Sequence, residues 1–350
     1  MQIKTIGWDI GGAHVKAALL NEDGEIISVY QVACPLWKGL DQLHIAVNSV
    51  LEQIPDPPIL HAITMTGELV DLFDNRDEGV NQIINTMQAL LPDAELQVFA
   101  GYEGLIEANN ITPQHYSAIA SANWLASALF SAQKVGNGLF VDIGSTTTDI
   151  LLLDDHRVLA EGYSDYQRLI TQELVYTGVV RTAVMAVAQS ALDKEQEIGL
   201  MAEYFATMAD VYRLTGELDE NHDQTDTADG AEKTVFASAK RLARMIGCDF
   251  YPEELARWQQ LAFNIRGQQL QKIQAACQRR LAWQGKSKDR PIIGAGIGRF
   301  LVRQVALSLE HPYIDFAELL TAPKLASSGM STADCAPAVA VACLASRCAN

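Results

Sequence analysis

One short phrase occurs twice in this chain of 350 residues. The first copy, residues 8–20, reads Trp-Asp-Ile-Gly-Gly-Ala-His-Val-Lys-Ala-Ala-Leu-Leu. The second copy, residues 141–153, reads Val-Asp-Ile-Gly-Ser-Thr-Thr-Thr-Asp-Ile-Leu-Leu-Leu. Each copy predicts an apolar strand that ends in Asp-Ile-Gly, a turn of small residues and a second apolar strand. One copy is typical of an ordinary hairpin, whereas two copies in register predict a duplicated scaffold whose paired turns face each other across a cleft.

Length and composition limit the class of protein. A chain of 350 residues favours two lobes over a single core. Apolar residues make up 49% and charged residues 20%, which is typical of a globular protein and not of a disordered one. No apolar run approaches the ~20 residues that span a membrane, and the N-terminus lacks the pattern of a signal peptide. We therefore expect a cytoplasmic protein, and the sequence leaves open whether it forms a homo-oligomer.

The formal net charge of -17 excludes some partners. Nucleic acids and anionic membranes are bound by basic faces, so we expect neither as a partner. A phosphorylated small molecule remains compatible with this charge, because backbone N–H groups and a carboxylate-bound cation can hold it.

The cysteines show no pattern of a metal site. There is no CxxC pair and no histidine at zinc-finger spacing. We expect reduced, mostly buried thiols at all six positions, namely Cys34, Cys248, Cys277, Cys335, Cys343 and Cys348.

The chain is predicted to divide into two α/β lobes. The turn Gly136-Asn137-Gly138 comes directly before the second copy of the phrase and predicts the boundary. We expect residues 1–135 to form the first lobe and residues 136–329 to form the second, with a helical insertion. An apolar C-terminal helix, about residues 330–350, is expected to pack back on the first lobe.

Helical periodicity is predicted to dominate the second lobe after its opening strands. It predicts four helices, over residues 169–189, 194–214, 231–246 and 253–281. Between the second and the third lies a segment dense in Asp, Thr and Asn, residues 219–230, which we expect to be a loop.

The two repeated turns carry residue types that bind phosphate. Glycine permits positive φ and lets a ligand approach bare N–H groups, and serine and threonine add hydroxyl donors. The expected phosphate-binding residues are Gly11, Gly12, Ala13, Gly144, Ser145, Thr146 and Thr147. Asp9 and Asp142, where the strands end, are expected to hold a divalent cation. The alternatives are two structural hairpins, or a dinucleotide fold, which the strand after each turn argues against.

A third Gly-rich segment follows in the order of a known superfamily. Residues 291–298 predict a strand and then a turn at Gly294, Gly296 and Gly298. Two phosphate loops followed by such a turn resemble the fold of actin, sugar kinases and heat-shock chaperone ATPases. The resemblance implies a two-lobed, ribonuclease H-like duplicated α/β fold with an interlobe cleft. It also implies that the third turn receives a nucleotide or a second substrate.

A closer resemblance lies in the second loop. Residues 142–149, Asp-Ile-Gly-Ser-Thr-Thr-Thr-Asp, resemble the loop of the hydantoinase A/5-oxoprolinase branch. Further segments resemble one subfamily of it, the tetrahydromethanopterin-linked C1-transfer pathway proteins; these are residues 66–69, 121–124, 227–230 and 241–247. Archaeal relatives include the methanofuran-pathway synthase. The resemblance implies that a furan-methyl diphosphate is joined to the phenol of γ-glutamyltyramine, forming an aryl ether and releasing diphosphate.

That reaction needs a group that offsets the charge of the diphosphate and a base that takes the phenol proton. Lys16 emerges on the strand after the first turn and is a candidate for the first role, or else a solvated strand lysine. Glu68, after a strand end and a glycine, is a candidate base, or else a cap of the next helix. His14, where many superfamily members carry Thr or Ser, is the other candidate base, or else a structural histidine.

Four further residues are substrate candidates. Asp229, in the acidic loop, is expected to bind an aminomethyl group or a cation, unless the loop is only solvated. Arg241 and Arg244, three apart on one helix face, are expected to approach a carboxylate or phosphate, the alternative being a plain surface pair. Asn123 lies in a segment that resembles the subfamily.

The preferred reading is therefore the aryl-ether synthase, with Mg²⁺ as the expected cofactor and a small-molecule diphosphate as the ligand. ATP is the alternative occupant of the loops. The competing functions are an ATP-dependent amidohydrolase of the hydantoinase/oxoprolinase kind, a small-molecule kinase, and a nucleotide-binding regulatory module without turnover.

Overall fold

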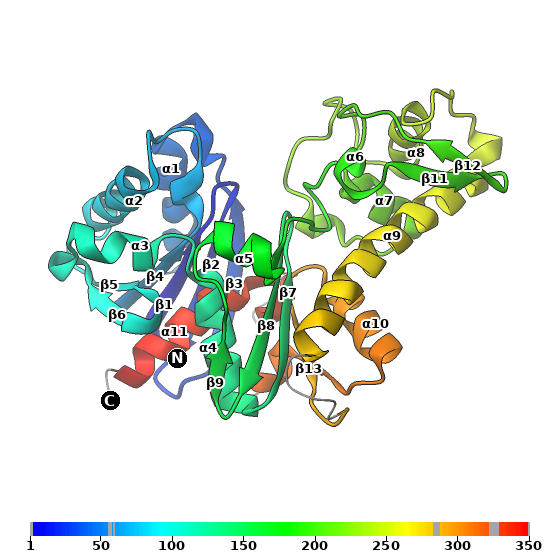
Figure 1. The fold of residues 1–350 in the computed structure, drawn as a ribbon. Coiled ribbons are helices and arrows are strands. Elements are labelled where there is room, and N and C mark those ends of the chain that lie inside the picture. The colour runs from blue at the N-terminus through cyan, green and yellow to red at the C-terminus, as the bar shows by residue number, and fades with distance from the viewer. Residues whose placement is uncertain (1–2, 55–57, 59, 283–287, 322–328, 349–350) are drawn as a thin grey trace. The chain divides into compact units, whose positions relative to one another are not determined.

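The computed structural model describes residues 3–54, 58, 60–282, 288–321 and 329–348. The chain forms two units, drawn in Figure 1. Unit 1 comprises Met1–Gly138, Leu153–Leu159 and Ile314–Asn350, and unit 2 comprises Leu139–Leu152 and Ala160–Tyr313.

Unit 1 is built on a six-stranded sheet in the order β3-β2-β1-β4-β5-β6. The strands are β1 (Ile3–Ile10), β2 (His14–Asn21), β3 (Ile26–Ala33), β4 (Leu60–Met65), β5 (Glu95–Phe99) and β6 (Leu105–Glu107). Strand β1 pairs antiparallel with β2 and parallel with β4. The first copy of the phrase therefore forms a hairpin in the middle of the sheet.

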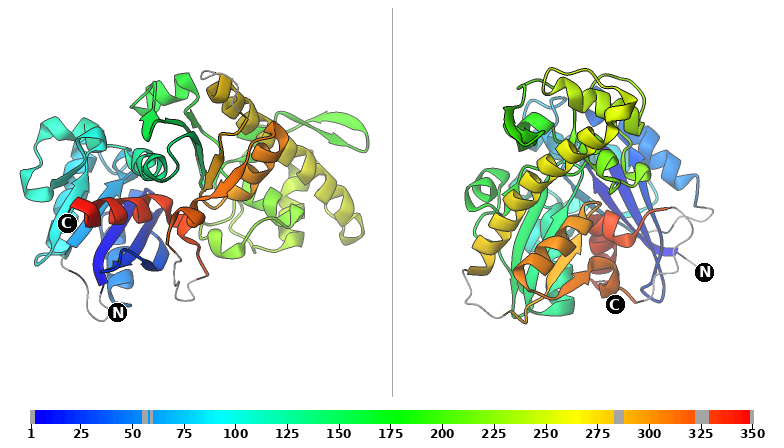
Figure 2. Two further views of the ribbon diagram at one scale, coloured as in Figure 1. Left: turned by 90° about the horizontal axis from the view of Figure 1, so that it is seen from below. Right: turned by 90° about the vertical axis from the view of Figure 1, so that its right-hand side faces the viewer.

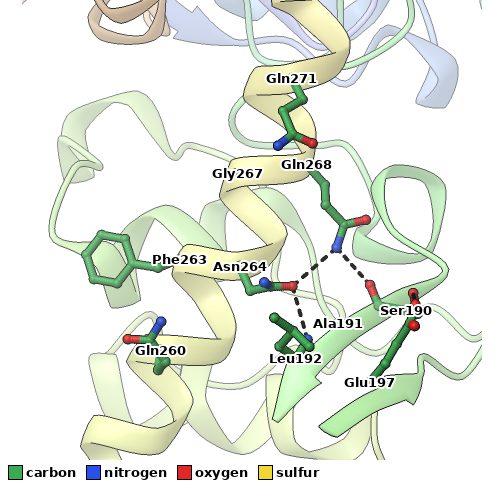
Figure 3. Close-up of a pocket in the computed structure, with 10 residues that line it drawn as sticks. All are labelled: Ser190, Ala191, Leu192, Glu197, Gln260, Phe263, Asn264, Gly267, Gln268 and Gln271. Carbon is green, nitrogen blue, oxygen red and sulfur yellow. Dashed lines mark hydrogen bonds between the residues drawn. The ribbon is translucent and has the colours of Figure 1, made fainter. Parts of the chain in front are cut away.

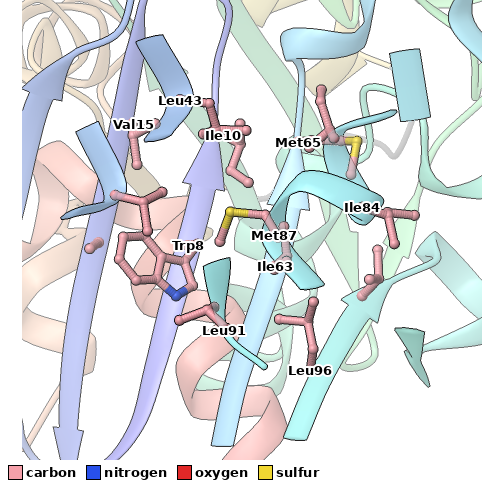
Figure 4. Packing of buried hydrophobic residues seen from close by; sticks show 14 of the residues in the cluster. Trp8, Ile10, Val15, Leu43, Ile63, Met65, Ile84, Met87, Leu91 and Leu96 are labelled. Atoms are coloured by element: carbon pink, nitrogen blue, oxygen red, sulfur yellow. The ribbon is translucent and has the colours of Figure 1, made fainter. Parts of the chain in front are cut away.

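One face of this sheet is covered by α1 (Asp41–Leu51) and α2 (Arg76–Leu90). On this side Trp8 and Ile10 of β1 pack in a buried apolar cluster with Met87 of α2 (Figure 4). Burying each side chain of this size contributes about 1.5–3 kcal/mol. The alternation of buried apolar residues along β1 thus fixes which face receives these helices.

The opposite face is covered by α4 (Asn123–Val135) and α11 (Ala336–Cys348). Helix α11 packs so closely on β1 that a Cβ on Gly7 would lie 2.1 Å from the carbonyl oxygen of Ala338. Figure 2 shows this helix, in red, lying along the blue strands of unit 1. Because side chains alternate between the two faces of a strand, Asp9 shares this side of the sheet with Gly7.

The second sheet has the order β10-β8-β7-β13-β14, with β9 beside β8. Its strands are β7 (Gly138–Ile143), β8 (Thr148–Asp154), β9 (Arg157–Leu159), β10 (Leu174–Val175), β13 (Ile292–Ala295) and β14 (Tyr313–Asp315). Strands β7 and β8 carry the second copy of the phrase, and β13 pairs in parallel with β7. Since parallel neighbours end at the same edge, the third Gly-rich turn comes beside the second phosphate loop.

The rest of unit 2 is mainly helical. Its helices are α5 (Asp165–Thr171), α6 (Val184–Val187), α7 (Met208–Thr215), α8 (Val235–Arg244), α9 (Leu255–Ala282) and α10 (Arg299–Leu309). Helices α8 and α9 confirm the predictions over residues 231–246 and 253–281. Helix α9 has 28 residues and packs against α7, α8 and α10.

The predicted helix over residues 169–189 is wrong. Only residues 169–171, the end of α5, and the single turn α6 are helical, and β10 and irregular backbone lie between them. Glu173 is fully buried and accepts hydrogen bonds from two backbone N–H groups of the loop before α5. Gly178 packs on the turn after β7, where a Cβ would lie 2.4 Å from the carbonyl carbon of Ser145. These tertiary contacts outweigh the helical spacing of the apolar residues.

The predicted helix over residues 194–214 is wrong in its first half. Strands β11 (Ser190–Asp193) and β12 (Gln196–Gly199) form a hairpin there, and only α7 at the end is helical. Lys194 and Glu195 have φ of 49° and 67°. A two-residue hairpin turn of type I′ requires such left-handed values at both central positions. Because this turn contains no glycine or asparagine, its sequence carries no signal for a hairpin, and the helical spacing of the apolar residues decided the prediction.

The cysteines lie mostly in the interior, as predicted. No disulfide joins the five whose side chains the structure describes, and four of these are buried. Burial raises the pKa of Cys34 and of Cys277 to about 12, which keeps both as unreactive thiols. The side chain of Cys348 lies outside the described part of the chain.

Candidate functional site

The two copies of the phrase form turns that are closed by the same hydrogen bond. In the first copy the N–H of Gly11 donates to the carbonyl of His14 at 2.9 Å. In the second copy the N–H of Gly144 donates to the carbonyl of Thr147 at 2.9 Å. The repeat in sequence is therefore also a repeat in backbone geometry.

The tip of each turn keeps its backbone donors. In the described part of the chain, the N–H groups of Gly12, Ala13, Ser145 and Thr146 donate to no other group. The Ser145 Oγ likewise has no hydrogen-bond partner among the described residues. Adjacent N–H groups in a turn form a concave site for anions. Each turn therefore offers donors to a phosphate group.

Gly11 and Gly12 of the first turn are needed for space, whereas Gly144 of the second turn is not. Positive φ was expected to be one reason for them, and this is wrong for Gly11, Gly12 and Gly144, all of which have ordinary φ. A Cβ on Gly12 would lie 2.7 Å from Cγ1 of Val70. A Cβ on Gly144 would come no closer to the protein than 3.6 Å, at the carbonyl of the threonine that closes the turn. A Cβ at Gly144 would therefore make only an ordinary van der Waals contact.

Asp9 is buried near the end of β1. It lies opposite Lys16 of β2 and Thr64 of β4, so the three side chains share one face of the sheet. Asn123, the first residue of α4, donates from Nδ2 to Oδ1 of Asp9 at 3.3 Å. The structure thus brings a predicted cation ligand and a predicted substrate residue into contact.

Glu68 lies next to the first turn and is only 1% exposed. The preceding Gly67 packs against the turn, where its Cβ would lie 3.3 Å from the carbonyl carbon of Gly11. Oε1 of Glu68 accepts a 2.6 Å hydrogen bond from Oγ of Ser121, a residue to which the sequence alone assigned no role. The alternative role of Glu68 as a helix cap is wrong, because the side chain of Asn75 caps α2.

Lys16 and His14 lie on β2 beside this site. Nζ of Lys16 donates to the backbone carbonyl of Asp334 at 2.7 Å. Asp334 belongs to the short 3₁₀ helix Thr332–Cys335, which comes directly before α11. The C-terminal segment therefore holds Lys16 on the sheet face that carries Asp9. His14 is buried, and its carbonyl closes the first turn.

The third Gly-rich turn packs against the second copy of the phrase. Gly296 has φ of 78°, and a Cβ there would lie 2.3 Å from Oδ1 of Asp142. The N–H of Gly298 donates to the carbonyl of Ile143 at 2.8 Å. Gly294, on β13, contacts the tyrosine ring of β14. The structure thus joins the predicted cation ligand of the second loop to the predicted second-substrate turn.

A segment that was predicted to be helical covers the second turn instead. The N–H of Arg181 donates to the carbonyl of Ser145 at 2.9 Å, and the N–H of Gly178 donates to Oγ1 of Thr182 at 2.8 Å. Gln269 of α9 is fully buried and donates to the carbonyl of Gly178 at 2.9 Å. The prediction missed these residues, since their only signal in the sequence is a glycine inside a helical pattern.

Asp149, which takes the place of Lys16 in the second copy, forms an ion pair with Arg168 of α5. The Arg168 side chain is 2% exposed. The second copy therefore replaces an ammonium group by a carboxylate that holds α5 against β8.

Asp229, Arg241 and Arg244 lie together in unit 2 and contact one another. Nη1 of each arginine lies 3.0 Å from a carboxylate oxygen of Asp229. Arg241 is fully buried and also contacts Asp210 of α7, so the two arginines are not a plain surface pair. Burial acts to raise the pKa of Asp229, but a backbone N–H and the arginines hold it below its usual value. The contacts tie the acidic loop to α8, and a role toward substrate stays a prediction.

A groove with a volume of about 490 Å³ lies between β11 and α9 (Figure 3). Asn264 accepts from the N–H of Leu192 at 3.1 Å, and Gln268 donates to the carbonyl of Ser190 at 2.8 Å. Side-chain amides of α9 thus form hydrogen bonds with backbone groups on the edge of β11. None of the predicted site residues lines this groove.

The carboxylates of the site suit one kind of metal binding. Among the residues that the structure describes, no group of three or more His, Cys, Asp or Glu could hold a metal ion. Mg²⁺ needs fewer protein ligands, because it is usually held by one or two carboxylates together with waters and substrate phosphates. Asp9 in unit 1 and Asp142 in unit 2 each offer one carboxylate of this kind. In the described ranges, no helix is long and apolar enough to cross a membrane.

Comparison with known proteins relates the chain to one family. The hydantoinase/oxoprolinase family matches residues 60–338. A synthase from Methanocaldococcus jannaschii is 32% identical over 250 residues, which cover 71% of this chain and 73% of the relative. Its named product is a furan-2-yl methanamine that carries a γ-glutamylaminoethyl-phenoxymethyl group. A synthase of the same name from Methanococcus vannielii is 31% identical over 123 residues, which cover 35% of this chain and 55% of that relative.

The fold is the two-lobed α/β fold of actin-like ATPases and sugar kinases. A nucleotide-free acetone carboxylase matches 88% of this chain and 67% of its own chain, with a TM-score of 0.56 and 10% sequence identity. At this identity the likeness shows the fold alone. The fold class predicted from the three Gly-rich segments is thereby confirmed.

Proposed function

Since this chain belongs to the hydantoinase/oxoprolinase family, we propose that it is a transferase of methanofuran biosynthesis. It joins a furan-methyl diphosphate to the phenol of γ-glutamyltyramine, forming an aryl ether and releasing diphosphate. The single observation that carries the proposal is the 32% identity over 250 residues to a synthase whose named product contains this ether.

The two turns are the proposed phosphate-binding segments. Four backbone N–H groups of these turns donate to no other described group; they belong to Gly12, Ala13, Ser145 and Thr146. Such donors bind an anion without any basic side chain, which suits a chain of net charge -17. In the proposed reaction, the anion that these N–H groups bind is the diphosphate group of the substrate.

In the proposed reaction the phenol oxygen attacks the methylene carbon on the furan. The bond from that carbon to the diphosphate oxygen breaks, and its electron pair leaves with diphosphate. The phenol proton passes to Glu68, whose buried carboxylate lies beside the first turn. Lys16 is the proposed group that offsets the charge of the leaving diphosphate, and His14 is the second candidate for the base.

Mg²⁺ is the proposed cofactor, held by Asp9 or Asp142. Gly296 leaves room for the carboxylate of Asp142, and Asn123 holds the carboxylate of Asp9. When bound, the ion would neutralise negative charge on the diphosphate.

The test is a product assay with purified protein, Mg²⁺ and the furan-methyl diphosphate, with and without γ-glutamyltyramine. Release of diphosphate that depends on the phenol supports the proposed function. The rival is an ATP-dependent hydrolase of the same family, which predicts ADP formation from ATP. ADP formation without phenol-dependent diphosphate release would overturn the synthase.

Gly144→Val tests the phosphate-binding role of the second turn. The Cβ of the new side chain meets Thr147 only at an ordinary contact distance of 3.6 Å, so the fold should persist while the affinity for diphosphate falls by ~10-fold or more. Gly199→Val is the control, because no atom lies within 4 Å of its Cβ position. Equal diphosphate affinity of the two variants refutes the role of the turn.

A further inference from the structure

Ser121 has a backbone conformation that its residue type disfavours. Its φ is 51°, a left-handed value that costs most residues about 1–2 kcal/mol. Glycine adopts this conformation readily, so the strain at Ser121 needs a reason. The serine side chain, which glycine lacks, is the candidate reason.

The hydroxyl of Ser121 reaches the carboxylate of Glu68. Oγ donates to Oε1 at 2.6 Å, and the two residues are 7% and 1% exposed. A buried hydrogen bond to a carboxylate is shorter and stronger than one between neutral groups. The contact joins positions that are 53 residues apart, one after β4 and the other before α4.

The backbone of Glu68 is fixed from another direction. Helix α2 packs directly on it through Gly79, where a Cβ would lie 2.4 Å from the carbonyl oxygen of Glu68. With its backbone held by α2 and one carboxylate oxygen held by Ser121, the side chain of Glu68 has a fixed orientation.

The same turn also holds Asp9. Asn123, two residues after Ser121, donates to Oδ1 of Asp9. The start of α4 therefore contacts both carboxylates of the unit 1 site, Glu68 through a hydroxyl and Asp9 through an amide. A change in the conformation of this turn would move both contacts together.

We propose that Ser121 is a positioning residue for Glu68, a role that rests on the proposed function of Glu68 as the base. Its hydroxyl orients the carboxylate for transfer of the phenol proton, and the left-handed backbone is what directs that hydroxyl at Oε1.

Three substitutions separate the hydroxyl from the backbone conformation. Ser121→Thr keeps the hydroxyl, whereas Ser121→Ala and Ser121→Gly remove it. Alanine and glycine lose the same hydrogen bond, but alanine remains strained at φ of 51° whereas glycine does not, so Ser121→Gly should be more stable than Ser121→Ala. Among the variants, stability should therefore depend on how well residue 121 tolerates the left-handed backbone, and activity should depend on whether it carries a hydroxyl.

The expected result is a fall in kcat of ~10- to 100-fold in both Ser121→Ala and Ser121→Gly, with KM for the diphosphate within about 2-fold of wild type. Ser121→Thr should keep most of the wild-type kcat despite a lower Tm. A wild-type kcat in Ser121→Gly would overturn the proposal, because the backbone shape alone would then be what matters.

A second measurement is independent of the substrate. The carboxyl carbon of Glu68 is followed by NMR against pH in labelled protein, with the signal assigned by Glu68→Gln. Removal of the donor in Ser121→Gly should move the titration midpoint to higher pH, because the hydrogen bond favours the ionised form. An unchanged midpoint overturns the role of Ser121. If the wild-type protein releases no diphosphate, but the midpoint still differs between the wild type and Ser121→Gly, the proposed function is overturned and the contact between Ser121 and Glu68 is not.

Discussion

Trp8 donates a 3.0 Å hydrogen bond from Nε1 to Nδ1 of His61, across the neighbouring strands β1 and β4. Nε2 of the same imidazole lies 3.0 Å from the carbonyl oxygen of Pro58. Because Nδ1 accepts, Nε2 carries the proton and the ring is neutral. Burial lowers the pKa of His61 to about 4, although the hydrogen bond to Pro58 acts in the other direction.

The free energy of unfolding should therefore rise with pH between about 4 and 6.5. The unfolded histidine binds a proton below about pH 6.5, whereas the folded one does so only below about pH 4, so protonation favours unfolding in this window. The full effect is about 3 kcal/mol, measured as urea midpoints across the pH range.

The control for this effect is His61→Gln. Its side chain keeps an acceptor for Trp8 and a donor for Pro58 but does not titrate. The variant should lose most of the rise in stability, and a pH dependence equal to that of the wild type would contradict the prediction.

Asn123→Ala should weaken Mg²⁺-dependent binding of diphosphate by about 5-fold, because one net hydrogen bond is worth about 1 kcal/mol. The substitution removes a contact that orients the carboxylate of Asp9. Isothermal titration calorimetry measures the affinity, and Asn85→Ala on the exposed side of α2 is the control. If both variants bind as the wild type does, the contact between Asn123 and Asp9 has no part in binding.

Gly178→Ala should displace the backbone of the second turn, on which Gly178 packs. Its Cβ would lie 2.4 Å from the carbonyl carbon of Ser145 and 2.4 Å from the nitrogen of Thr146, so the backbone must shift. We expect a loss of about 2–3 kcal/mol in stability together with weaker diphosphate binding. Thermal unfolding and calorimetry measure the two effects. Gly199→Ala, in open space, should change neither, and a Gly178 variant that behaves like it would show that the covering segment is not needed.

Arg168→Met should destabilise unit 2 by about 3–5 kcal/mol, because it leaves the carboxylate of Asp149 buried beside α5 without its cation. Burial already raises the pKa of Asp149 against the opposing charge of Arg168. The loss should therefore shrink in acid, where Asp149 binds a proton in the variant. Urea unfolding at several pH values measures this. The double variant with Asp149→Leu should recover most of the stability, and failure to recover would show that the pair does more than neutralise charge.

The two turns were predictable because their determinants are local. Each consists of a few consecutive residues between apolar strands, and the closing hydrogen bonds, from Gly11 to His14 and from Gly144 to Thr147, span only those residues. The long helices α8 and α9 were predictable for a similar reason, since their apolar residues recur at helical spacing over several turns.

Residues 169–214 could not be predicted in this way. Their apolar spacing is helical, but apart from the end of α5, the single turn α6 and α7 the segment folds as short strands, turns and irregular backbone. Glu173 and Gly178 decide this, one through a buried carboxylate that binds backbone N–H groups and the other through the absence of a side chain. Neither effect is visible without the partner that it contacts.

The sequence by itself determined the duplicated hairpin, the order of the three Gly-rich segments and hence the fold class, because these depend on neighbouring residues. Only the tertiary structure decided which side chains meet at the site. Ser121 contacts Glu68 over 53 positions, and Asn123 contacts Asp9 over 114 positions. Such contacts arise because α4 packs on the sheet face that carries Asp9, and burial of the apolar side chains of α4 stabilises it there.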